Sequence, residues 1–218
     1  MELDRIDIKN LAIVLNKNTT MSRYSELIEN KEDIIKALIM SNINTSDDFF
    51  EQYRNNSEIL AANTKIEQSV LDMLALFLSF HRYRNRKIKE FTSIGIDNIS
   101  ILNNYGITTT KGLIDSCNTE KKRKLVADET KISAHVIKKA VCLADIARLP
   151  GIKDIRSSLY YDCGFISIKN IASQKPTEFI EKTSQFIEAN NIDKKPPLFK
   201  EITTQIAWAK VYPDVIQL

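Results

Sequence analysis

The sequence predicts an all-α fold built from a repeated helical unit, and three observations support this prediction. Hydrophobic residues make up 43% of the 218 residues and charged residues 27%, a composition typical of a globular protein with a substantial core. Glycine and proline number only five each, whereas an all-β fold needs many tight turns. One short turn-like segment also occurs three times along the chain.

The repeated segment has the features of a turn between two helices. In the copy with the sequence LNNYGITT, Gly106 can adopt the left-handed conformation that closes a helix, and a following threonine can cap the next one. The pattern recurs in LIMSNINT, which turns at Asn42, and in YYDCGFIS, which turns at Gly164. Because asparagine is the next-best residue at a left-handed cap, we expect positive φ at all three residues.

The first two copies stay alignable beyond the turn. The sequence TKIEQSV at 64–70 matches TKISAHV at 130–136, and each leads into a long helix. Apolar residues at helical spacing and the capping residues between them predict helices in chain order. These helices are expected near residues 4–16, 20–29, 31–41, 46–54, 56–62, 67–84, 86–92, 97–104, 110–117, 119–128, 133–147, 153–162, 168–173, 176–189 and 198–209.

The core and the domain boundaries follow from the same patterns. The polar stretch 190–197 ends in two prolines and is expected to be a linker, after which Trp208 docks the last helix on the body. The predicted core residues are Leu38, Ile43, Phe49, Leu74, Phe77, Leu102, Ile107, Leu113, Val136, Ile137, Leu149, Leu159 and Phe165. The predicted parts are an N-terminal helical extension (1–33), a first degenerate repeat (34–97), second and third hairpin units (98–190), and a linker with a C-terminal docking helix (191–218).

Two segments carry a more specific pattern. LPGIKDI at 149–155, followed by GFIS, and SIGID at 93–97, followed by GITT, resemble helix–hairpin–helix motifs. The chain resembles, over roughly 34–190, a family of uncharacterised bacterial and archaeal proteins with tandem helix–hairpin–helix-like repeats and a domain of unknown function. This resemblance implies a fold and a relation to the hairpin modules of DNA-repair proteins, and it implies no activity.

The hairpins depart from the DNA-binding pattern at one position each. In that pattern, two glycines let backbone N–H groups approach a phosphate. The chain keeps the first glycine as Gly95 and Gly151, but Asp97 and Lys153 occupy the second position. Asp97 places a carboxylate where a phosphate would lie, whereas Lys153 could attract a phosphate but obstructs close backbone approach. The pattern therefore favours the fold more strongly than DNA binding.

The densest basic run is FHRYRNRKIK at 80–89, which suits phosphate neutralisation and is equally typical of a solvated helix end. A second cluster, KKRK at 121–124, has the same two interpretations. The candidate nucleic-acid-binding residues are Arg82, Arg84, Arg86, Lys87, Lys89, Gly151 and Lys153, and the candidate hairpin turns are Gly95, Gly106, Gly151 and Gly164.

Other site types lack support in the sequence. The only histidines, His81 and His135, are too few for a zinc site, and we identify no catalytic residues, metal ligands, cofactor motif or small-molecule site. Three cysteines without a CxxC pair fit a reducing cytoplasm, and the most apolar stretch, 70–80, is too short to span a membrane.

Two functions remain open from the sequence. The first is a non-catalytic helix–hairpin–helix-like binding module that contacts nucleic acid through a basic face. The alternative is a protein–protein interaction or scaffold module whose degenerate hairpins no longer bind DNA. The net charge of +3 permits an anionic partner without requiring one.

Overall fold

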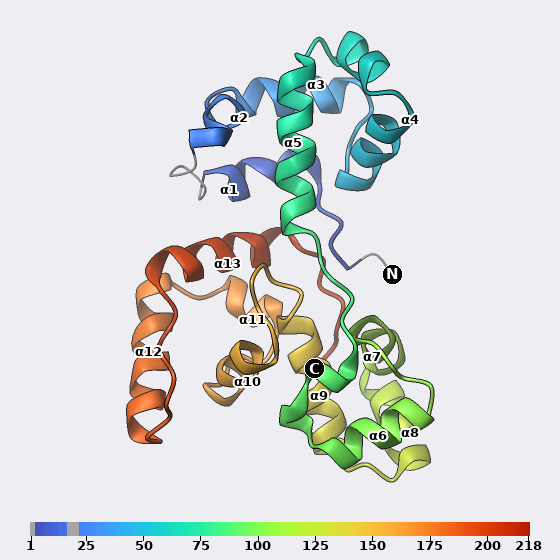
Figure 1. Ribbon diagram of the computed structural model, residues 1–218, viewed down its shortest axis with the longest axis vertical. Coiled ribbons are helices and arrows are strands. Elements are labelled where there is room, and N and C mark those ends of the chain that lie inside the picture. Colours follow the sequence, from blue (N-terminus) through green and yellow to red (C-terminus); the bar gives the residue numbers. More distant parts are fainter. Residues whose placement is uncertain (1–2, 17–21) are drawn as a thin grey trace. The chain divides into compact units, whose positions relative to one another are not determined.

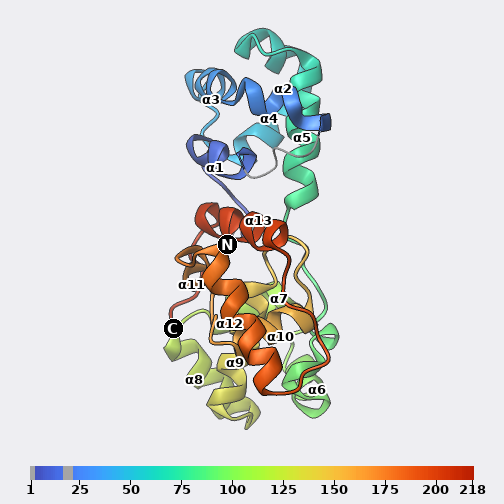
Figure 2. The ribbon, with the colours of Figure 1, turned by 90° about the vertical axis from the view of Figure 1, so that its left-hand side faces the viewer.

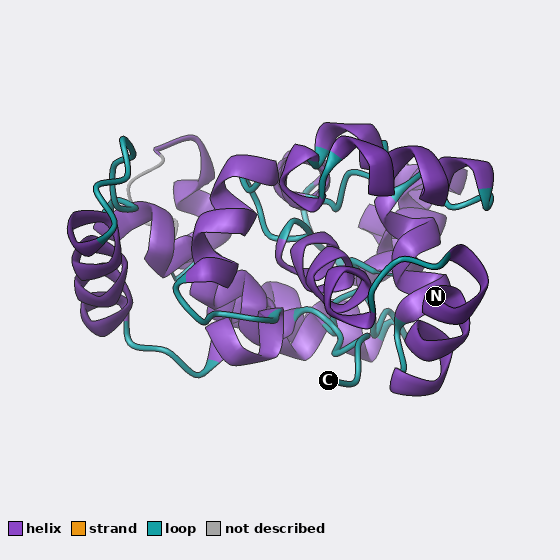
Figure 3. Ribbon diagram, turned by 90° about the horizontal axis from the view of Figure 1, so that it is seen from below, coloured by secondary structure: helices purple, strands orange, loops and turns teal. Residues whose placement is uncertain are grey.

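A computed structural model describes residues 3–16 and 22–218 of the chain. Within these ranges the protein is helical and has no strand; the only extended pairing consists of two isolated bridges (Figure 3). The predicted all-α class is therefore confirmed. The beginning of the helix predicted at 20–29 lies outside the described residues.

The chain forms two compact units. The first unit comprises the chain up to Arg82 together with Lys210–Pro213, and the second unit comprises Tyr83–Ala209 together with Asp214–Leu218. The boundary between the units thus follows Arg82, whereas the predicted repeat boundary follows residue 97. Figure 1 follows the chain through both units in colour.

The first unit contains five α-helices within its described part. They are α1 (Leu11–Leu15), α2 (Ser25–Glu29), α3 (Lys31–Met40), α4 (Ser46–Thr64) and α5 (Gln68–His81), with short 3-10 turns η1 (Ile8–Asn10) and η2 (Ser22–Tyr24). Two separate helices are predicted from the sequence across α4. The structure agrees with this prediction, because Asn56 has a non-helical backbone (φ −164°, ψ 100°) and divides α4 into two helical segments. The Asn56 side chain accepts a hydrogen bond from the N–H of Ile59 at 2.9 Å and caps the second segment.

The second unit begins with two 3-10 turns. Its last helix, α13, continues past Ala209 into residues that belong to the first unit. The elements are η3 (Ile88–Glu90), η4 (Thr92–Ile94), α6 (Ile96–Asn104), α7 (Thr110–Cys117), α8 (Glu120–Thr130), α9 (Ala134–Ile146), α10 (Asp154–Asp162), α11 (Ile168–Ala172), α12 (Pro176–Ala189) and α13 (Phe199–Val211). Figure 2 shows α12 in front of α10, with the linker returning from the end of α12 to α13.

The three repeated turns have the expected backbone. Asn42, Gly106 and Gly164 have φ values of 59°, 96° and 89°. In each copy, the N–H of the following apolar residue returns to a carbonyl in the last turn of the preceding helix at 2.9–3.0 Å. These donor–acceptor pairs are Ile43 to Leu38, Ile107 to Leu102, and Phe165 to Tyr160. The local turn motif therefore recurs three times.

The first two copies share a further set of hydrogen bonds. After the turn, the N–H of Ser46 donates to the Ile6 carbonyl, and the N–H of Thr110 donates to the Arg86 carbonyl, both at 2.9 Å. Later in each copy, Lys65 and Lys131 adopt left-handed φ values of 58° and 62°. The repeat seen in the sequence is thus a repeat of backbone geometry.

Most of the predicted core is confirmed, since all its members are buried except Val136, which is half-buried. Trp208 is also buried, as expected of a docked helix.

The helix predicted at 86–92 is wrong. The α5 helix ends at His81, and the chain then runs extended to Lys87, because the backbone of Arg86 and Ile88 pairs with residues 108–110 and not with its own helical neighbours.

The apolar helix expected at 70–80 is α5, whose inward side is buried in the first unit. Across residues 3–16 and 22–218, none of the helices is both long enough and apolar enough to cross a membrane.

We expect the stability of the first unit to fall when the pH drops below about 6.5. Burial lowers the pKa of His81 from its ordinary 6.5, and the Arg23 charge lowers it further, although a hydrogen bond from the ring Nδ1 to the Phe77 carbonyl opposes this. The folded state therefore binds fewer protons than the unfolded state, and the stability present above 6.5 is lost as pH falls through the lowered pKa.

Thermal unfolding by circular dichroism at pH 7.5 and 5.5 measures this effect. The variant His81→Gln should lose the difference between the two pH values, and the exposed His135→Gln should keep it. An equal pH dependence in wild type and His81→Gln would show that another group is responsible.

Candidate functional site

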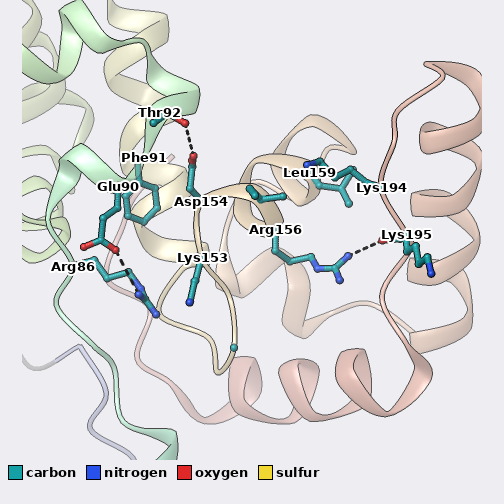
Figure 4. A pocket seen from close by; sticks show the side chains of 12 residues that line it. Arg86, Glu90, Phe91, Thr92, Lys153, Asp154, Arg156, Leu159, Lys194 and Lys195 are labelled. Carbon is teal, nitrogen blue, oxygen red and sulfur yellow. Dashed lines mark hydrogen bonds and ion pairs between the residues drawn. The ribbon is translucent and has the colours of Figure 1, made fainter.

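A cleft in the second unit lies beside the turn that joins α9 to α10. It has a volume of about 520 Å³. Five of the side chains that line it are cationic, and two are carboxylates. The cationic residues are Arg86, Lys153, Arg156, Lys194 and Lys195, and the carboxylates are Glu90 and Asp154 (Figure 4).

Arg86 is held at the cleft by the repeated backbone pairing. Its carbonyl accepts the N–H of Thr110, and its own N–H donates to the Thr110 hydroxyl at 3.1 Å. The guanidinium lies 3.6 Å from the Glu90 carboxylate, and the side chain is 20% exposed. Its Nε atom is buried and has no hydrogen-bond partner among the residues that the structure describes. The exposed part of the guanidinium is suited to an anionic ligand.

Lys153 lines the same cleft from the turn between α9 and α10. Gly151 turns the chain with φ 77°, and the buried Ile152 anchors the turn. Lys153 then has extended φ and ψ of −129° and −175° and precedes the first residue of α10. Because any residue adopts that backbone, the turn does not need a second glycine. Figure 4 shows the Arg86 and Lys153 side chains reaching toward one another.

Asp154 would repel an anion, but its carboxylate is occupied. One oxygen accepts from the Thr92 hydroxyl at 3.0 Å, and the other accepts from the Ser93 hydroxyl at 2.5 Å. These bonds fasten η4 to the first residue of α10. Asp154 also lies in the first turn of α10, where the helix dipole tolerates its negative charge.

The opposite wall of the cleft depends on the linker before α13. The Arg156 guanidinium donates to the Lys195 carbonyl at 2.9 Å and lies 3.5 Å from the Glu201 carboxylate. This contact holds the linker with its two lysines beside α10. The Tyr160 hydroxyl donates to the side-chain Oε1 of Gln205 at 2.8 Å. The Gln205 side-chain nitrogen donates to the Pro150 carbonyl at 3.5 Å, so α13 supports the turn between α9 and α10.

The structure brings together only part of the residue set chosen from the sequence. Arg86, Gly151 and Lys153 line the cleft. Arg82 belongs to the first unit, where it forms ion pairs with Asp4 at 2.9 Å and Asp47 at 3.7 Å. The other three cationic residues chosen from the basic run are exposed and do not line the cleft; these are Arg84, Lys87 and Lys89.

The remaining hairpin and basic-cluster residues lie elsewhere. Gly95 has the positive φ of a turn at 90°, and Asp97 is exposed in the first turn of α6. The KKRK cluster is not a uniformly solvated face, because Arg123 is buried and donates to the Cys117 carbonyl at 3.1 Å.

Three further cationic residues line the cleft that were not among those predicted from the sequence; these are Arg156, Lys194 and Lys195. Arg156 lies three residues after Lys153, a spacing that places both on one side of a helix start. The two lysines precede the proline pair of the linker, and only the folding of that linker onto α10 brings them near the hairpin. Ile155, the second apolar residue after the Gly151 turn, is 63% exposed.

The cysteines are unsuited to nucleophilic chemistry at neutral pH. Burial raises the pKa of Cys117 and Cys163 to about 11 and that of Cys142 to about 12, so each thiol stays protonated. In the described part of the chain, no three His, Cys, Asp or Glu side chains are grouped so as to hold a metal ion.

Replacing Gly151 by alanine should destabilise the second unit by about 1–2 kcal/mol, the cost of a left-handed residue that carries a Cβ. An added Cβ would meet no atom within 4 Å, so the cost comes from the backbone conformation and not from a clash. Urea unfolding measures it.

Gly112→Ala is the matched control, because Gly112 lies in α7 without positive φ and alanine favours a helix. Equal stability of Gly151→Ala and wild type would show that the turn tolerates a side chain.

The comparisons with known proteins identify a family and no activity. Residues 92–212 match the model of a family described as a domain of unknown function, DUF4332, and the chain belongs to this family. The match covers more than half of the chain, includes the whole cleft except Arg86, Glu90 and Phe91, and extends through α13. It begins later and ends later than the resemblance seen in the sequence. No curated protein and no solved structure matches the chain.

Proposed function

We propose that the second unit is a non-catalytic module that binds nucleic acid by its phosphate backbone. The observation that carries this proposal is that Arg86 and Lys153 line one cleft beside the Gly151 turn. An arginine fork and a lysine ammonium together match the geometry and charge of a phosphate.

The charge balance of the cleft supports the binding of an anionic ligand. Five cationic side chains face two carboxylates, and both oxygens of Asp154 already accept hydrogen bonds. Phosphate contacts of this kind supply affinity that does not depend on base sequence. The lysines on the linker extend the cationic lining of the cleft beyond the hairpin.

The proposed contact differs from that of a double-glycine hairpin. There, backbone N–H groups approach the phosphate directly. Here the Lys153 side chain occupies the second glycine position, and side chains of Arg86 and Lys153 make the contact. The relation to hairpin modules of DNA-repair proteins is part of this proposal and rests on the Gly151 and Gly164 turns.

The alternative, a protein-interaction module, is favoured by one observation. Near the cleft, Ile155, Leu198 and Phe199 are 63%, 74% and 58% exposed. Exposed apolar side chains of this size suit a protein partner. Such a partner would bind with weak dependence on salt, whereas a phosphate contact is strongly salt-dependent.

Fluorescence anisotropy with labelled DNA at 50 and 200 mM salt tests the proposal. If about three phosphates are neutralised, affinity should fall roughly tenfold or more between these concentrations. The variant Lys153→Ala should weaken binding and reduce the salt slope by about one contact, whereas the exposed Lys124→Ala on α8 should change neither. Absence of binding at 50 mM salt would refute the proposal.

A further inference from the structure

We infer that the nucleic acid is bound as a single strand, with one unstacked base in a second hollow that continues the cleft along α10. This inference rests on the proposed function and names the form of nucleic acid that the site would take. The observation behind it is that a cationic hollow and an apolar hollow are joined on one helix.

The second hollow has a volume of about 260 Å³. It shares Thr92, Asp154, Ile155, Leu159 and Lys194 with the cationic cleft, so the two are parts of one groove. Beyond the shared residues it is lined by the apolar Phe186 of α12 and Ile192 of the linker, and by the polar Ser93, Ser158 and Asp162. The groove therefore leads from Arg86 and Lys153 to an apolar end.

The apolar end suits a base. Ile155, Leu159, Phe186 and Ile192 offer flat apolar contact, and Phe186 is an aromatic ring only half-buried by its own chain. Bases stack on aromatic and apolar side chains in proteins that hold single strands. The Ser158 hydroxyl and the Asp162 carboxylate also line this end and can accept N–H groups from the edge of a base.

A duplex does not fit both parts of the groove. Its bases are paired and stacked, so a base can enter an apolar hollow beside the phosphate site only if it leaves the stack. A single strand exposes its bases at little cost. The combination of phosphate contacts and an adjacent apolar hollow therefore favours the single strand.

The experiment compares three labelled probes at low salt: a short single-stranded DNA, the matching duplex, and an abasic single strand of the same length. The single strand should bind about tenfold more tightly than the abasic strand, because stacking of one base contributes at least this factor. The variant Ile155→Ser should reduce binding of the single strand to that of the abasic strand and leave the abasic strand unchanged.

Controls separate this inference from the proposed function. Ile96→Ser removes a similarly exposed isoleucine on α6 and should change nothing. Arg86→Ala should weaken both single-stranded probes. Equal affinity for all three probes would overturn the inference and leave the proposed function standing. If none of the three probes binds, the proposed function fails, and the inference fails with it. Circular dichroism of each variant shows that the fold is kept.

Discussion

Replacing Asp145 by alanine is expected to lower the free energy of unfolding of the second unit by about 3–5 kcal/mol. Asp145 and Arg148 form a buried ion pair, with Nη1 and Oδ1 at 2.5 Å and side-chain exposures of 3% and 0%. Removing the carboxylate leaves the charge of Arg148 buried without that partner. Burial raises the pKa of Asp145, while the Arg148 charge and the Ile168 N–H oppose this rise.

Asp145 also completes the third copy of the repeat. In the first two copies, the N–H that follows the capping residue donates to a backbone carbonyl. In the third copy the equivalent N–H, that of Ile168, donates to the Asp145 carboxylate at 2.8 Å. The alanine variant therefore loses an ion pair and also the acceptor that fixes the start of α11.

Urea unfolding followed by tryptophan fluorescence measures this loss, because the single tryptophan, Trp208, is buried in the second unit. Asp145→Asn keeps an acceptor for the Ile168 N–H and should lose less stability than alanine. The exposed Asp128→Ala is the control and should stay within about 0.5 kcal/mol of wild type. A loss below about 1 kcal/mol in Asp145→Ala would contradict the role given to the pair.

The second large effect concerns binding. Reversing the charge of both Arg86 and Lys153 to glutamate should weaken nucleic-acid binding about a hundredfold or more at 50 mM salt. Two favourable phosphate contacts are lost, and two like charges are placed against the phosphate, which costs several kcal/mol.

The double variant Arg84→Glu with Lys87→Glu is the matched control. It changes the net charge by the same amount as the first double variant. Its two residues are exposed, lie in the segment that contains Arg86, and do not line the cleft. We expect its affinity to fall by only about threefold through the loss of general attraction. If the two double variants lose affinity equally, the basic run as a whole, and not the cleft, binds the ligand.

The repeated turns could be predicted from the sequence because the residues needed for a left-handed backbone are few. Asn42, Gly106 and Gly164 mark the turns, and the apolar residue after each one packs back on its helix. The helix pattern and nearly all of the chosen core followed from apolar spacing for the same reason, since these are local signals.

The cleft could be predicted only in part because its assembly depends on long-range contacts. The stretch after His81 has the composition of a helix, but pairing of Arg86 and Ile88 with residues 108–110 holds it extended. That pairing brings Arg86 to the hairpin and leaves Arg84 and Lys87 outside the cleft. Likewise, Lys195 reaches the site through the contact of its carbonyl with Arg156, which no spacing in the sequence reveals.

The most direct test of the central claim is an NMR titration of the isotopically labelled full chain with a short single-stranded DNA. We expect the largest amide shifts to fall in two segments far apart in sequence, 86–92 and 151–156, and to disappear when the charges of Arg86 and Lys153 are reversed. Shifts centred on other elements, or uniform small shifts that survive the charge reversal, would contradict the claim that the Gly151 cleft is the phosphate site.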